Sequence, residues 1–162
     1  MDIATLLDDF RHLHNEARAG VLATSQLSEY RSARDQLTRL LLAAQHIALL
    51  PGQQPRLALR VARSLAVELY FHDRTVRAMT TQVSSGGFAA LAGNAPQQGE
   101  EVRIRLHLPG GQPLETTARV VSSSQQIGQR TTSFQFAKLN ETEAERIEIF
   151  VFDAILQHFQ GI

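Results

Sequence analysis

The chain has 162 residues, of which 43% are hydrophobic, with 16 basic and 16 acidic residues and no cysteine. This length suits one domain of common size with an appendage, and the balanced charge gives no overall field that attracts nucleic acid or an anionic membrane. Disulfides, thiolate metal sites and a cysteine nucleophile are excluded. No stretch reaches the roughly 20 apolar residues of a spanning helix, so we expect a cytoplasmic protein without membrane insertion.

The first fifty residues predict a helical hairpin. Hydrophobic residues recur at helical spacing from Ile3 to Leu13, and Gly20 follows as a C-terminal cap. Thr24 or Ser25 is the expected N-cap of a second helix that runs toward Leu50.

The segment PGQQP, from Pro51 to Pro55, ends the helical pattern, and beyond it hydrophobic residues alternate with a period of two. The expected strands are Val61–Phe71, Thr75–Thr81, Val102–Leu108, Leu114–Val121 and a last strand around Phe134 and Phe136. Turn signals, such as PGG at residues 109–111, separate them. Short strands at even spacing favour a small antiparallel barrel or sandwich.

Asn140, with Glu143 three residues later, predicts the start of a last helix that extends to about His158. This helix has two hydrophobic faces, so one covers the β-domain and the other needs a second partner. The residues expected at that contact are Leu37, Leu40, Leu41, Phe152, Leu156 and Phe159. We expect them to pack within one chain, and a homodimer is the alternative.

Residues with catalytic chemistry do not form a recognisable constellation. His12 and His14 are two apart and point to different faces of a helix, so solvated histidines are expected there rather than a metal site. Ser84 and Ser85 lack the GxSxG pattern of a nucleophile elbow, and the glycines that follow lack the lysine of a phosphate-binding loop. We expect no enzyme, no metal and no cofactor.

Three arginines, Arg56, Arg60 and Arg63, cluster where the chain enters the first strand. An arginine can lie flat on an aromatic base and can donate paired hydrogen bonds to a guanine edge or a phosphate. Surface arginines are common, however, so the trio alone does not separate a binding site from a solvated connector.

Four stretches together resemble a PilZ domain: Arg56–Leu69, Arg74–Leu91, Glu101–Val121 and Ser133–Phe150. The resemblance extends from about Gln53 to about Phe159 and leaves the first fifty residues outside. It implies an α+β fold, in which a six-stranded antiparallel β-barrel carries a C-terminal helix and the N-terminal helical hairpin is added to it. The expected domains are therefore residues 1–50 and residues 51–162.

PilZ domains usually act as receptors for the bacterial second messenger cyclic di-GMP. Arg56 and Arg60 match the RxxxR motif of the family, and Ser84 and Gly87 match the second motif, [DN]xSxxG. The resemblance implies that the arginines stack on guanine or pair with its edges or phosphates, that Ser84 donates or accepts a hydrogen bond, and that Gly87 lets the backbone approach the ligand. Gln82 stands where the family has Asp or Asn.

Arg63 is an additional candidate for ligand binding, next to Arg60. In this interpretation the connector from Pro51 to Pro55 folds over the ligand and moves the helices, and a downstream protein receives the signal.

Two other functions stay open. Glutamine offers one acceptor oxygen where aspartate offers two, so Gln82 weakens guanine recognition, and the alternative is a PilZ-fold adaptor that has lost nucleotide binding. A barrel that binds nucleic acid is disfavoured by the neutral charge, the two tyrosines and the absence of tryptophan for base stacking.

Overall fold

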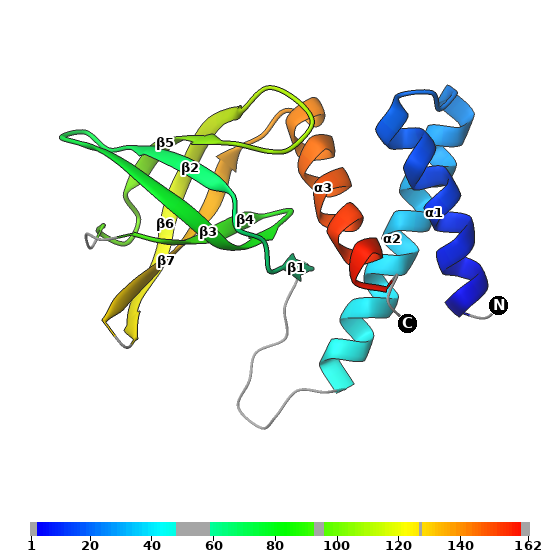
Figure 1. Ribbon diagram of the computed structural model, residues 1–162, viewed down its shortest axis with the longest axis horizontal. Coiled ribbons are helices and arrows are strands. Elements are labelled where there is room, and N and C mark those ends of the chain that lie inside the picture. The colour runs from blue at the N-terminus through cyan, green and yellow to red at the C-terminus, as the bar shows by residue number, and fades with distance from the viewer. Residues whose placement is uncertain (1–2, 48–58, 93–95, 127, 160–162) are drawn as a thin grey trace. The chain divides into compact units, whose positions relative to one another are not determined.

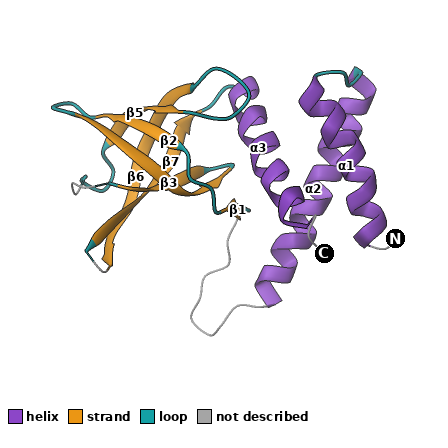
Figure 2. Ribbon diagram, in the orientation of Figure 1, coloured by secondary structure: helices purple, strands orange, loops and turns teal. Residues whose placement is uncertain are grey.

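The computed structural model describes residues 3–47, 59–92, 96–126 and 128–159, and these contain three helices and seven strands (Figures 1 and 2). The chain divides into two compact units. One unit comprises residues 1–59 together with residues 152–162, and the other comprises residues 60–151. The boundary between them falls inside the last helix, so residues 152–162 cluster with the N-terminal helices and not with the barrel.

The helical hairpin is formed by α1 (Ile3–Ala19) and α2 (Thr24–Ile47). Gly20 ends α1 in the left-handed conformation, with a φ of 71°, and its N–H donates to the carbonyl of Ala17 at 3.1 Å. A residue with a Cβ is strained in that conformation, so the predicted glycine cap is confirmed.

The start of α2 differs from the prediction by one residue. Ala23 takes the N-cap position, because its carbonyl accepts the first helical hydrogen bond, from Leu27 N–H at 2.9 Å. The side chain of Gln26 reaches back, and its Oε1 accepts from the Ala23 N–H at 3.1 Å. The expected cap at Thr24 or Ser25 was wrong, since a side chain inside the helix supplies the missing acceptor.

Aromatic side chains from all three helices form the core of the helical unit. Phe10 stacks on Tyr30 with ring centroids 5.5 Å apart and meets Phe152 edge-on at 5.4 Å. Leu37 and Leu156 are buried with them. The predicted packing within one chain is therefore confirmed for Leu37, Phe152 and Leu156.

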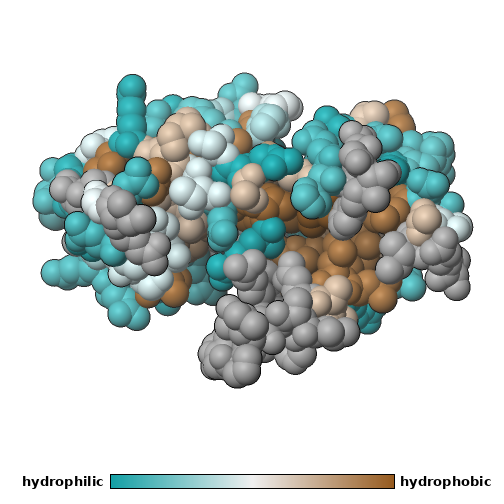
Figure 3. Space-filling view, turned by 60° about the horizontal axis from the view of Figure 1, so that its bottom comes forward, coloured by the Kyte–Doolittle hydropathy of each residue, from teal (hydrophilic) through white to brown (hydrophobic). Residues whose placement is uncertain are grey.

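The other three residues of that predicted contact are not shown to be buried. Leu40 is 41% exposed, Leu41 is half-buried, and the side chain of Phe159 lies outside the described residues. Figure 3 shows hydrophobic side chains gathered over the helical part of one face. None of the described helices is long and apolar enough to cross a membrane.

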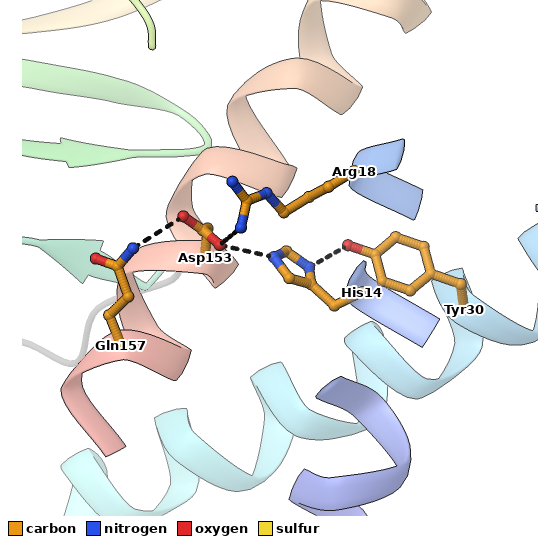
Figure 4. Close-up of polar contacts among 5 residues, drawn as sticks. All are labelled: His14, Arg18, Tyr30, Asp153 and Gln157. Carbon is orange, nitrogen blue, oxygen red and sulfur yellow. Dashed lines mark hydrogen bonds and ion pairs between the residues drawn. The ribbon is translucent and has the colours of Figure 1, made fainter. Parts of the chain in front are cut away.

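His14 lies inside the helical unit, at 1% exposure, so the expected solvated histidine was wrong at this position (Figure 4). Its Nδ1 lies 2.9 Å from the Tyr30 hydroxyl, and its Nε2 lies 3.4 Å from Oδ1 of Asp153. Arg18 and Gln157 donate to the same carboxylate, at 2.8 and 3.2 Å. A buried imidazole is tolerated because these neighbours supply polar contacts.

The barrel unit contains seven strands: β1 (Arg60–Val61), β2 (Ala66–Tyr70), β3 (Thr75–Ser84), β4 (Gly87–Leu91), β5 (Glu101–Leu106), β6 (Leu114–Gln126) and β7 (Gln129–Lys138). The sheet order is β1-β3-β2-β5-β6-β7-β4, and β3 also pairs with β4. That last pairing closes six antiparallel strands into a barrel and leaves β1 outside it. The predicted six-stranded barrel is confirmed.

The first expected strand, Val61–Phe71, is divided into β1 and β2. Both pair with β3, and the buried Thr80 of β3 fills the gap between them. The Thr80 hydroxyl accepts from the Leu65 N–H at 2.8 Å and donates to the Arg63 carbonyl at 2.7 Å. One side chain thus satisfies backbone groups that a continuous ladder would have paired.

Side chains of alternating residues fill the barrel, and on the last strands these include Phe88, Phe134 and Phe136. The last helix, α3 (Glu141–Phe159), begins as predicted, since Oδ1 of Asn140 accepts from the Glu143 N–H at 2.8 Å.

Gly87, at the start of β4, has a structural requirement to be glycine. A Cβ added there would collide with the backbone carbonyl oxygen of Phe134 and would lie 3.0 Å from the Cα of Gln135. Strand β7 therefore approaches β4 so closely at this point that only a hydrogen fits.

We predict that Gly87→Ala lowers the free energy of unfolding by about 1–3 kcal/mol, the usual cost of overpacking. Gly86→Ala is the matched control, because nothing lies within 4 Å of a Cβ at that position and its φ is not in the left-handed region. Denaturant unfolding of both variants checks this. Equal stability of the two variants would contradict the close approach of β7.

A second prediction concerns pH. Burial lowers the pKa of His14 below its ordinary value of 6.5, an effect that Asp153 opposes and that Arg18 and Arg34 reinforce. The unfolded chain then binds more protons than the folded chain below about pH 6.5, so stability is present above that pH and is lost as the pH falls.

Thermal unfolding of the full chain at about pH 7.5 and about pH 5.5 measures the loss. We expect His14→Gln to unfold with a smaller pH dependence than the wild type. His12→Gln, which changes an exposed histidine of the same helix, should keep the wild-type dependence. If His14→Gln behaves like the wild type, His14 does not carry the effect.

Candidate ligand-binding site

Four strands place residues of both motifs in one transverse row on the barrel. Arg60 of β1 is the Cα partner of Ser84 in β3, and Ser84 is the partner of Gly87 in β4. Gly87 is in turn the partner of Gln135 in β7. Neighbouring strands lie about 4.8 Å apart, so the row spans about 15 Å from Arg60 to Gln135. Two of its four residues, Ser84 and Gly87, belong to the second motif, and Arg60 belongs to the first.

Arg60 carries the positive charge of this row. Its side chain is exposed, and within the described part of the chain it makes no hydrogen bond or ion pair. A guanidinium in that state can stack on a base or donate paired hydrogen bonds without first breaking a bond to the protein.

Ser84 closes the β3–β4 hairpin through its hydroxyl. The hydroxyl donates to the Gly87 carbonyl and accepts from the Gly86 N–H, both at 3.3 Å. Both bonds are long, and a hydroxyl oxygen has a second lone pair, so the group retains capacity for a ligand.

A β-bulge decides where Gln82 and Ser84 point. Ala78 and Thr80 are buried, so strict alternation would turn Gln82 and Ser84 inward as well. The register shifts between Thr80 and Gln82, and beyond the shift it is Val83 that is buried. Gln82 and Ser84 are consequently half-buried on the outer side, where a ligand can reach them.

Gln82 lies two residues before Ser84, in the next row that faces outward, opposite Ala89 of β4. Its amide makes no hydrogen bond to any described residue. The amide therefore offers one acceptor and two donors to a ligand, where an aspartate would offer acceptors alone.

Of the two remaining predicted residues, the structure describes only Arg63. Arg56 lies outside the described residues. Arg63 lies between β1 and β2, half-buried, and its guanidinium donates to the Ala62 carbonyl at 3.0 Å. The structure thus brings Arg60, Ser84 and Gly87 together and puts Gln82 beside them.

Sequence reasoning missed two residues here. Thr80 fixes the backbone between β1 and β2, and Gln135 extends the row of Arg60 onto β7. Gln135 is the polar position between two phenylalanines of the last expected strand, which marks it as outward-facing. Nothing in that local pattern shows which strand residues it lies beside.

Several charged side chains elsewhere on the barrel are paired with one another. Arg105 donates to Glu115 at 2.9 Å, and Arg119 donates to Glu101 at 3.1 Å. Tyr70 donates to Glu68 at 2.6 Å, and this hydrogen bond lowers the pKa of Glu68 and raises that of Tyr70. Among the described residues, no group of three His, Cys, Asp or Glu side chains is placed to hold a metal ion.

Solved structures with the same fold are numerous, at low sequence identity. The PilZ domain of YcgR from Escherichia coli, solved with c-di-GMP, has a TM-score of 0.58 and 19% identity, over 67% of this chain and 97% of that chain. The Bacillus subtilis motility inhibitor MotI/DgrA has a TM-score of 0.59 and 20% identity, over 65% of this chain and 53% of that chain.

MrkH from K. pneumonia, in a c-di-GMP complex, has a TM-score of 0.61 and 15% identity, over 68% of this chain and 57% of that chain. The chain thus spans about half the length of MotI/DgrA and MrkH. No curated protein matches the sequence significantly. The family model of the PilZ domain matches residues 53–153. The chain therefore belongs to the PilZ domain family.

Proposed function

We propose that this protein is a cyclic di-GMP receptor that signals to a protein partner. The observation that carries the proposal is the row in which Arg60, whose guanidinium has no partner among the described residues, faces outward beside Ser84 and Gly87. PilZ membership supports it, as do the YcgR and MrkH structures, whose ligand is c-di-GMP.

Each group in the row has a matching group on the ligand. The Arg60 guanidinium stacks on a guanine and donates to its edge or to a phosphate, which suits an anionic ligand with purine faces. The Ser84 hydroxyl and the Gln82 amide supply hydrogen bonds of moderate strength. No step in this scheme makes or breaks a covalent bond, so ligand binding acts as a conformational signal.

The signal is proposed to pass through the segment that joins the helices to β1. Arg56 lies four residues before Arg60, so a ligand held by both arginines also holds this segment. Contacts between a ligand and this segment restrict the conformations of the elements that the segment connects, and a downstream protein that binds one of those conformations then responds to ligand binding. Association into a homodimer remains part of the proposal, because Val21 and Leu40 are exposed at 67% and 41% on the described helices.

A second candidate is an adaptor that no longer binds nucleotide and works through protein contacts alone. Gln82 is the observation in its favour. An aspartate at that position can accept hydrogen bonds from both N–H groups of a guanine Watson–Crick edge. A glutamine can accept only one of them, because its NH2 group is a donor and would face the second guanine donor.

The first experiment is a calorimetric titration of the full chain with cyclic di-GMP. We expect wild-type binding and a loss of about one to two decades in affinity for Arg60→Ala, because a charge-assisted hydrogen bond contributes about 1.5–3 kcal/mol. Arg103→Ala removes an exposed arginine of β5 as the matched control and should bind like the wild type. A wild type that gives no heat and no signal in a more sensitive assay would refute the receptor.

Gln82→Asp separates the two candidates. A receptor weakened by Gln82 should gain about tenfold in affinity, the equivalent of one charge-assisted hydrogen bond. If the wild type does not bind and Gln82→Asp creates binding, the adaptor is the correct function. Gln112→Asp adds the same charge in the β5–β6 turn and should leave affinity unchanged. If the wild type binds and Gln82→Asp does not raise its affinity, Gln82 does not weaken ligand binding.

A further inference from the structure

We propose that Gln135 of β7 is a further ligand-contacting residue, which donates hydrogen bonds from its side-chain amide to acceptors of the bound cyclic dinucleotide. This inference rests on the proposed function and extends its site across β4 to a strand that neither motif includes. It starts from strand register, because Gln135 is the Cα partner of Gly87, the last residue of the second motif.

Gln135 faces outward and its amide is available. Its neighbours Phe134 and Phe136 are buried inside the barrel, whereas Gln135 is exposed. Within the described residues its side chain makes no hydrogen bond. A ligand on the outer face therefore meets free donors there.

The motif end of β4, which lies between β3 and β7, has little side-chain bulk on its outer face. Gly87, Ala89 and Leu91 alternate with the inward-facing Phe88 and Ala90 of β4; Gly87 is itself buried against the β7 backbone, and the half-buried Ala89 adds a single methyl group. Gln82 and Ser84 stand on one side of them, and Gln135 stands on the other. Ser84 and Gln135 are two strand spacings apart, about 10 Å, so a planar base lying over β4 comes within reach of both side chains.

Charge in the same row indicates which groups of the ligand lie near β7. Arg119 of β6 follows Gln135 in the row, but its guanidinium is already paired with Glu101 at 3.1 Å. The Gln135 amide adds donors that have no partner among the described residues and that lie one strand nearer to β4 than Arg119, and phosphate oxygens or the O6 and N7 acceptors of guanine are their natural partners.

The test is the cyclic di-GMP titration repeated with three variants of the full chain. We expect Gln135→Ala to lower affinity about three- to tenfold, the value of one hydrogen bond. Gln129→Ala removes an exposed glutamine of the same strand, far from the row, and should bind like the wild type. Gln135→Glu keeps the length, loses the donors and adds negative charge beside an anionic ligand, so it should lower affinity more than Gln135→Ala.

The outcomes separate this inference from the proposed function. If the wild type binds and Arg60→Ala impairs binding while Gln135→Ala matches Gln129→Ala, the role of Gln135 is refuted and the receptor stands. If Gln135→Glu binds as well as the wild type, the donor role is refuted. A wild type that does not bind overturns the receptor and the role of Gln135 together.

Discussion

The β-bulge of β3 is the constraint on which the candidate site depends. Up to Thr80 the even-numbered side chains of this strand face the core, and after the bulge the odd-numbered Val83 takes that place. Without the extra residue, Gln82 and Ser84 would point into the barrel, and Arg60 would lie beside an apolar position. The same stretch of β3 pairs with β1 through Val83 and Ser84 and with β4 on its other edge, so one local irregularity sets which side chains face outward beside both neighbouring strands.

Polar groups serve opposite purposes in the two units. In the helical unit, Nδ1 of His14 is hydrogen-bonded to the Tyr30 hydroxyl and its Nε2 lies 3.4 Å from Asp153, so the cluster links three helices through side chains that are distant in sequence. On the barrel, the amides of Gln82 and Gln135 and the guanidinium of Arg60 have no partner among the described residues. Satisfied buried groups hold a fold together, whereas unsatisfied exposed groups remain ready for a ligand.

Local patterns predicted much of this fold. The helices, the glycine cap at Gly20, the start of α3 at Asn140 and most strands follow from periodicity and turn residues, which act over a few positions. The division between β1 and β2 did not, because it depends on the side chain of Thr80 from another strand. The burial of His14 was missed for the same reason, since its partners come from α2 and α3.

The site was predictable to the extent that motif spacing reflects structure. Arg60, Ser84 and Gly87 were named because they match the two motifs of the family that the sequence resembles, and the register brings them together. Gln135 was not named, because strand pairing between β4 and β7 leaves no mark in either segment. Gly87 was expected to admit a ligand, and the structure adds a separate reason for that glycine in the close approach of β7.

The central claim is that one face of the barrel, defined by the row from Arg60 to Gln135, holds the ligand. Amide chemical shifts of the full chain, followed by NMR during titration with cyclic di-GMP, test it most directly. The largest changes should fall on Ser84, Gly87 and Gln135, with little change at Glu68, Arg105 and Glu115 on β2, β5 and β6. Changes concentrated on those three strands, or no changes at all, would contradict it.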